Sequence, residues 1–276
     1  MSLVQLKVKR ALKVPIDAPE INPSFLVGKS NRDICNLEVW EGNRKTKIEK
    51  IFEVKGEPGD DTEKIRIKII GDVSKVKKIG KKMDGGNIQI MGNAGMHLGN
   101  DMKNGIISVQ GNVGSWLGSN MKGGIIEVKG NAGDLVGSGY RGGSDGMRGG
   151  SIIVQGKAGN EVGCWMRGGT IQILGNVGLC PGVHMKKGTI YIKENCLGRA
   201  GAQMQGGKII LDGRIPDILP SFNIESKRGS TRVGKEKIEG PFYLFHGDNN
   251  EDGNGRLYVK IDNNPQLNWF EELIEI

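Results

Sequence analysis

Cysteine, histidine and aromatic residues are scarce in this 276-residue chain, and each scarcity excludes a class of protein. The four cysteines include no C-x-x-C pair, so the spacing typical of zinc and thiol redox sites is absent. So few cysteines in a chain of this size do not form a disulfide framework. Aromatic residues make up only 5% of the chain, and no row of them could stack the bases of a nucleic acid.

Long hydrophobic runs are absent as well. No apolar stretch approaches the roughly 20 residues that a membrane-spanning helix needs. The first ten residues alternate apolar and polar side chains, which is typical of a strand, and they lack the apolar segment of a signal peptide. We therefore expect a cytoplasmic protein that contacts no membrane.

Motifs of catalysis and ligand binding are incomplete. Segments such as 92–99 resemble phosphate loops, but no helix follows whose N-terminus could hold the phosphate. Segment 248–253 begins like a calcium loop, yet Val259 stands where that loop needs a glutamate. Three cysteines fall at different phases of the repeat described below, which favours small buried side chains over a metal cluster: Cys164, Cys180 and Cys196. The sequence predicts no catalytic residue, cofactor or metal in this chain.

Glycine, in contrast, is abundant, with 46 residues, most of which follow a repeat. Each repeat unit opens on a methionine, and the steps between these methionines are 19, 19, 26, 19, 19 and 19 residues. The seven positions are Met83, Met102, Met121, Met147, Met166, Met185 and Met204. Five residues after each methionine comes an isoleucine, and two residues later Ile, Val or Leu. A fixed period of this length is typical of a solenoid.

Each unit predicts one coil. Alternating apolar residues form a strand with one face inward, a glycine ends the strand, and an asparagine usually follows. Stacked asparagines are expected to form a ladder of side-chain amides. A further unit near 64–73 brings the number of coils to about eight. Because parallel crossovers are nearly always right-handed, the predicted fold is all-β, a right-handed parallel β-helix with non-repetitive N- and C-terminal caps.

The repeat divides the chain into three parts. Residues 1–60 form an N-terminal β-rich cap or docking segment, residues 61–213 the β-helix, and residues 214–276 a C-terminal cap and docking tail. Outside the repeat, the pattern predicts strands at 3–14, 36–40, 50–55, 242–245 and 257–261. Residues 268–274 are expected to form a short helix or a docking tail.

Two departures from the repeat suggest contacts with a partner. The 26-residue step places an insertion at 138–146, and insertions in solenoids become loops, often on the binding face. Ile106 and Ile125 occupy outward positions of adjacent coils, so we expect an apolar patch covered by the N-terminal part or by a partner. With the aromatic residues of the C-terminal tail, the candidate partner contacts are Ile106, Ile125, Tyr140, Arg141, Trp269 and Phe270.

The charge leaves two interpretations open. The net charge is +8, and lysine and arginine are distributed at one or two per repeat. This fits either a solvated cationic surface or docking onto a more acidic partner. The scarcity of aromatic residues disfavours nucleic acid.

The repeat M-x-G-G-x-I-x-V-x-G-N-A-G resembles the glycine-rich C-terminal β-helix of the glutamate synthase large subunit. With this length and these flanks, the chain is similar to the C-subunit family of formylmethanofuran dehydrogenases, the tungsten- or molybdenum-containing complexes of methanogenic archaea. The resemblance covers about residues 64–213. The related β-helix subunit of a formyltransferase/hydrolase complex is a close alternative.

The resemblance implies a non-catalytic structural subunit of a ferredoxin-linked oxidoreductase complex that reduces CO2 and fixes it as formylmethanofuran. Other subunits would carry the cofactors: a molybdopterin or tungstopterin subunit, ferredoxin-like subunits with iron–sulfur clusters, and an amidohydrolase-like subunit with a dinuclear metal site. A different hypothesis is a stand-alone catalytic β-helix of the lyase or acyltransferase kind. That hypothesis needs a cleft with clustered acids or a histidine, and hexapeptide acyltransferases repeat every 18 residues instead of 19.

Overall fold

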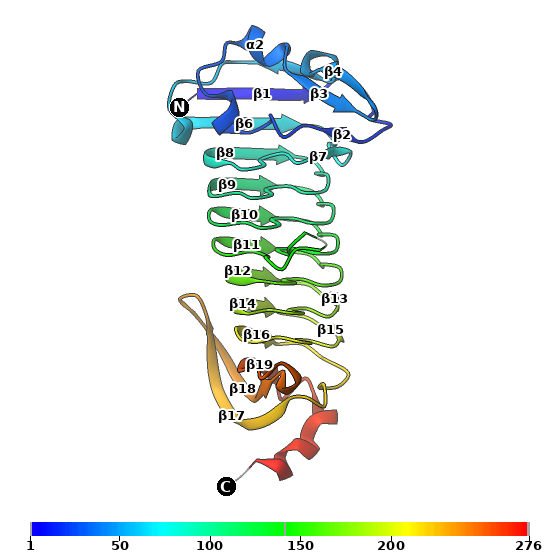
Figure 1. Ribbon diagram of the computed structural model, residues 1–276, viewed down its shortest axis with the longest axis vertical. Helices are drawn as coiled ribbons and strands as arrows, with labels where there is room; N and C mark the ends of the chain where they lie inside the picture. The colour runs from blue at the N-terminus through cyan, green and yellow to red at the C-terminus, as the bar shows by residue number, and fades with distance from the viewer. Residues whose placement is uncertain (1, 141, 275–276) are drawn as a thin grey trace.

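The computed structural model describes residues 2–140 and 142–274, and most of its regular structure is β-strand (Figure 1). A 13-stranded sheet runs along the long axis, in the order β17-β18-β19-β16-β14-β12-β11-β10-β9-β8-β6-β1-β5. Within the described ranges, no helix is long and apolar enough to cross a membrane.

The centre of this sheet is a stack of coils, each of which contributes one strand (Figure 1). The strands are β6 (Ile65–Ile70), β8 (Asp84–Met91), β9 (Asn104–Val109), β10 (Ile125–Val128), β11 (Ser151–Val154), β12 (Arg167–Ile173), β14 (Lys187–Ile192) and β16 (Lys208–Leu211). Each strand is parallel to the next, and equivalent residues of the repeat are Cα partners. The register is kept across the 26-residue step, where Ile126 pairs with Ile152. The all-β expectation and the eight-coil count agree with this arrangement.

Isoleucine and methionine columns fill the inside of the stack. All seven isoleucines and all seven methionines of the repeat are fully buried. The methionines also explain a glycine near the start of a strand: a Cβ on Gly150 would lie 2.8 Å from Met121 Cε and 2.6 Å from the carbonyl oxygen of Gly124. Gly150 has a φ of +85°, so a side chain there is disfavoured on both counts.

Asparagine side chains connect the coils, but to the backbone and not to one another. Asn93 Oδ1 accepts the backbone N–H of Asn112 at 2.9 Å, and Asn112 Oδ1 accepts that of Asn131 at 2.8 Å. The expected ladder therefore exists, but its donors are backbone N–H groups instead of side-chain amides. The side-chain oxygen of each asparagine lies next to the backbone N–H of the following coil. The ladder continues at Lys157, whose N–H donates to Asn131, but the lysine side chain offers no acceptor to the coil that follows.

A second, irregular side closes each coil. It contains β13 (Val177–Leu179) and β15 (Cys196–Gly198), which pair in parallel. In earlier coils the pairing is reduced to isolated bridges that link Val73, Ala94, Val113 and Ala132.

The N-terminal part continues the stack. Strand β1 (Ser2–Val8) is parallel to β6 and antiparallel to β5 (Phe52–Lys55). A small sheet lies beside it, formed by β4 (Arg44–Lys47), β3 (Glu38–Glu41), β2 (Ile16–Asp17) and β7 (Val76–Lys77). Short helices complete this end: α1 (Pro23–Leu26), α2 (Asn31–Cys35), and the 3-10 helices η1 (Ile48–Lys50) and η2 (Thr62–Lys64).

The C-terminal part folds back onto the sheet. Strand β19 (Gly255–Lys260) is parallel to β16, and the hairpin of β17 (Asn223–Val233) and β18 (Glu236–Gly247) runs up beside the last coils (Figure 1). Val233 and Phe242 of the hairpin form a second apolar cluster with Tyr191 and Ile210 on the outside of the stack. The 3-10 helices η3 (Asn249–Glu251) and η4 (Pro265–Leu273) follow, and η4 overlaps the range 268–274 expected for a short helix or tail.

Candidate partner-binding surface

The outward face of β9 and β10 carries the apolar patch that the sequence predicts. Ile106 and Ile125 are Cα partners in adjacent coils, and their exposed fractions are 42% and 39%. Within their column the flanking coils place Asn87 on one side and Ser151 on the other. The expectation that the N-terminal part covers this patch is wrong, because that part extends the sheet at its end instead of folding over its face.

A column of cations runs beside the patch. In five successive coils the residue after the repeat methionine is basic: Lys103, Lys122, Arg148, Arg167 and Lys186. We call these five residues the cationic column. Parallel strands lie ~4.8 Å apart, so like charges are brought close together along the stack. Two unit charges 4 Å apart repel by about 1 kcal/mol in water, which side chains reduce by turning away from each other. The one or two basic residues per repeat that the sequence shows therefore include one that recurs at the same position in five coils.

Two carboxylates already contact the cationic column. Asp145 lies between two of its members, with Oδ2 2.6 Å from Arg148 and Oδ1 2.6 Å from Arg167 Nε. Asp84, which occupies the column's position one coil earlier, lies 3.4 Å from Lys103 Nζ. Among the described residues, no ion pair is found for the other two members of the column, Lys122 and Lys186.

The insertion at 138–146 attaches to the stack at both ends. Tyr140 stacks on His97 at a centroid distance of 5.3 Å, and His97 also stacks on Trp116 at 5.1 Å. Asp145 holds the other end through its arginine pairs. Tyr140 nevertheless remains 46% exposed, as a contact residue must be. Arg141 lies outside the described residues.

The two candidate contacts at the C-terminal end, Trp269 and Phe270, differ in their exposure. Trp269 is 57% exposed, whereas Phe270 is 8% exposed and packs edge-on against Phe245 at 4.9 Å. Phe270 is therefore a core residue of the C-terminal part, since η4 turns its side chain inward. Only Trp269 of this pair presents its side chain at the surface.

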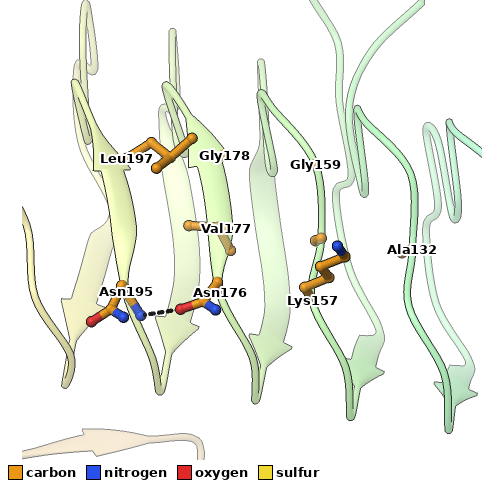
Figure 2. A pocket seen from close by; sticks show the side chains of 9 residues that line it. Ala132, Lys157, Gly159, Asn176, Val177, Gly178, Asn195 and Leu197 are labelled. Atoms are coloured by element: carbon orange, nitrogen blue, oxygen red, sulfur yellow. Dashed lines mark hydrogen bonds between the residues drawn. The ribbon is translucent and has the colours of Figure 1, made fainter.

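A shallow groove follows the irregular side of the coils (Figure 2). It has a volume of about 480 Å³, and its floor consists mostly of glycine and small apolar residues because adjacent coils approach closely there. Figure 2 shows Asn176 and Asn195 at one edge, joined by a hydrogen bond of 3.0 Å from the N–H of Asn195 to Oδ1 of Asn176. Leu197, at the other edge, is 66% exposed. The groove carries no charged side chain other than Lys157.

Three of the thiols have a raised pKa. Burial raises the pKa of Cys164 to about 12, with a further contribution from Glu161, and burial raises the pKa of Cys196 to about 11. Cys180 also has a raised pKa, chiefly because it is partly buried. Thiols protonated at neutral pH are poor nucleophiles and poor metal ligands. Cys164 and Cys180 do line one groove of about 350 Å³ with His184, a proximity that the phase of the repeat does not indicate. No group of metal-ligating side chains is found within residues 2–140 and 142–274.

No family model matches the chain. Individual relatives do. Over 99 residues the chain is 43% identical to the C subunit of tungsten-containing formylmethanofuran dehydrogenase 2 from Methanothermobacter wolfeii. Over these residues, the chain is homologous to the C subunits of formylmethanofuran dehydrogenases. The C subunit of molybdenum-containing formylmethanofuran dehydrogenase 1, from Methanosarcina barkeri, is 39% identical over 98 residues.

These matches cover 36% of this chain and 37% and 33% of the two relatives. The fold likeness extends further. A chain of the formyltransferase/hydrolase complex (FhcABCD) from Methylorubrum extorquens, solved with methylofuran, superposes with a TM-score of 0.81. That superposition covers 93% of this chain and 99% of the other, at 24% identity, so it establishes a shared fold.

The cationic column is the feature that sequence reasoning missed. Its signal was present, because the position after each repeat methionine can be compared directly from unit to unit. The hairpin that covers the last coils had no such signal, since it depends on contacts between Val233 and Phe242 and coils far away in the chain.

Proposed function

We propose that the chain is a non-catalytic structural subunit of a complex of the formylmethanofuran dehydrogenase type, which reduces CO2 and fixes it as formylmethanofuran in methanogenesis. The observation that carries the proposal is the 43% identity to the C subunit of such an enzyme. The fold shared with a chain of the formyltransferase/hydrolase complex supports it over nearly the whole length.

Cofactors and partners follow from the same proposal. The tungsten or molybdenum pterin, the iron–sulfur clusters and the dinuclear metal site would belong to other subunits, namely molybdopterin or tungstopterin, ferredoxin-like and amidohydrolase-like chains. The assembly would be cytoplasmic, where the four free cysteines stay reduced. The stack itself would be a right-handed parallel β-helix, which the parallel pairing of successive coils supports.

A second candidate is the equivalent subunit of a formyltransferase/hydrolase complex, which the fold likeness favours. Purification of the tagged native chain from its own cells distinguishes the two candidate functions. A dehydrogenase complex contains a metal–pterin subunit and oxidises formylmethanofuran with an electron acceptor, whereas the other complex does neither. Isolation of the chain alone, with turnover of a sugar or acyl substrate, would contradict both.

The apolar patch gives a test of assembly. We expect Ile106→Asp together with Ile125→Asp to abolish co-purification of the other subunits, because a carboxylate at each centre of a buried interface leaves an unpaired charge. The matched control is Leu179→Asp with Leu197→Asp, two exposed residues on the irregular side. Unchanged co-purification of the isoleucine variant, at unchanged thermal stability, would show that partners do not cover this patch.

A further inference from the structure

We infer that the cationic column binds an acidic segment of a partner subunit. The inference deepens the proposed function and rests on it for the source of the segment. The column consists of Lys103, Lys122, Arg148, Arg167 and Lys186, which lie in five successive coils beside the apolar patch.

The fold does not require cations in this column. From Lys103 onward, the residue after each repeat methionine donates its backbone N–H to the carbonyl of the methionine one coil earlier, as Lys122 does to Met102 at 2.7 Å. Gln205, at the same position in the last coil, makes the same bond with Met185 at 2.8 Å. The first such position, Asp84, is acidic. Since the backbone bond needs no particular side chain, the hydrogen bonding of the coil does not account for the five cations.

The column already recognises carboxylates. Asp145 bridges Arg148 and Arg167 at 2.6 Å from each, and the side chains of these three residues are 38–52% exposed. The contact from Arg148 is also a charge-assisted hydrogen bond, which is the stronger class of hydrogen bond. The anions seated on the column are therefore carboxylates of Asp or Glu type. Lys122, between the Asp84–Lys103 pair and the Asp145 bridge, has no such anion among the described residues.

The surroundings of Lys122 repeat this imbalance. The strands on either side of β10, β9 and β11, carry no carboxylate, and β10 itself carries the single acid Glu127. Five cations at ~4.8 Å per coil extend over roughly 20 Å, about the length of six residues in extended conformation. The geometry fits an extended acidic segment of this length. Its carboxylates would contact the cations, and its apolar side chains would contact Ile106 and Ile125.

The binding test uses the isolated full chain and a fluorescein-labelled hexaglutamate peptide. We expect salt-dependent binding that Lys103→Gln with Lys122→Gln weakens by about three- to tenfold at low ionic strength. Glutamine is the residue that the last coil carries at this position. The control, Lys13→Gln with Lys235→Gln, removes the same charge from exposed sites away from the column and should change the affinity by less than about twofold.

Equal losses in the two double variants would overturn the inference, because the peptide would then sense only net charge. A hexathymidylate that binds more tightly than hexaglutamate, with the same dependence on Lys103 and Lys122, would overturn it in favour of nucleic acid. Both outcomes concern the isolated chain, so they do not depend on whether the proposed complex forms.

The second test locates the segment in the purified complex. A carbodiimide joins a lysine amine to a carboxylate in direct contact, as an amide with loss of water. We expect cross-linked peptides that connect Lys122 or Lys103 to Asp or Glu of another subunit. Lys122 should also be protected from acetylation in the complex, relative to the isolated chain. Equal acetylation of Lys122 in both forms would overturn the inference, whereas failure to isolate any complex would contradict the proposed function instead.

Discussion

The outer face of the 13-stranded sheet is covered in one region of the stack and exposed in another. Over the last coils the hairpin β17–β18 covers it, and Tyr191 and Ile210 are 7% and 0% exposed. Over the middle coils nothing in the described chain covers it, and Ile106 and Ile125 stay exposed. Both regions have the same parallel register and the same buried isoleucine and methionine columns. The inside of the stack is therefore the same whether or not its outer face is covered.

The largest expected effect contrasts the two regions directly. Ile210→Ala should lower the free energy of unfolding by about 2–5 kcal/mol, because it leaves a cavity under the hairpin. Ile125→Ala, at an exposed position, should change it by less than about 0.5 kcal/mol. Urea unfolding of the isolated chain measures both. Similar losses from the two variants would show that the open face is as important to the fold as the covered one.

A second contrast concerns glycines in the coils and in the hairpin. Gly150→Ala should cost about 1–3 kcal/mol or more, because its Cβ would press on the backbone of the coil before it and its φ is +85°. Gly229, in the hairpin, has open space around the site of a Cβ, so Gly229→Ala should have little effect. Thermal unfolding of the two variants decides the matter. A stable Gly150→Ala protein would mean that the coils can shift apart, against the close packing described above.

The smallest effect should be a gain. Lys157→Asn supplies the missing acceptor in the asparagine ladder of the open coils, and one added hydrogen bond contributes about 0.5–1.5 kcal/mol. Lys157→Gln is the control, because its longer side chain places the amide beyond the equivalent position. The urea midpoint should rise for asparagine only. A rise of the same size for glutamine would attribute the gain to the removal of charge.

The interior of the stack could be predicted from sequence because one period governs it. The columns of Ile126 and Met121 are visible as soon as the repeat units are aligned, and both are fully buried. The partner of each asparagine was wrong, since a one-dimensional repeat shows which side chains stack but not whether an amide oxygen meets a side chain or a backbone N–H. Phe270 was assigned to the surface for a related reason, because its burial depends on Phe245 in a distant strand.

The candidate surface was predictable only in part. Ile106 and Ile125 stand out against polar neighbours within their own column, which makes them visible in the sequence. The absence of a cover over them is a tertiary property, because the N-terminal part could fold over the face or extend it with equal local preference. The domain boundaries at 60 and 213 and the relation to glutamate synthase stay predictions.

Because the coils stack in register, the number of repeat units sets the length of the molecule. Each strand of the stack pairs with the strands next to it, so one more or one fewer 19-residue unit would move the two ends apart or together by ~4.8 Å and leave the residues of each end unchanged. The extra residues of the 26-residue step leave this length alone, because they bulge sideways while Ile126 and Ile152 remain paired. Length and surface can thus vary independently, one through the number of units and the other through insertions between them.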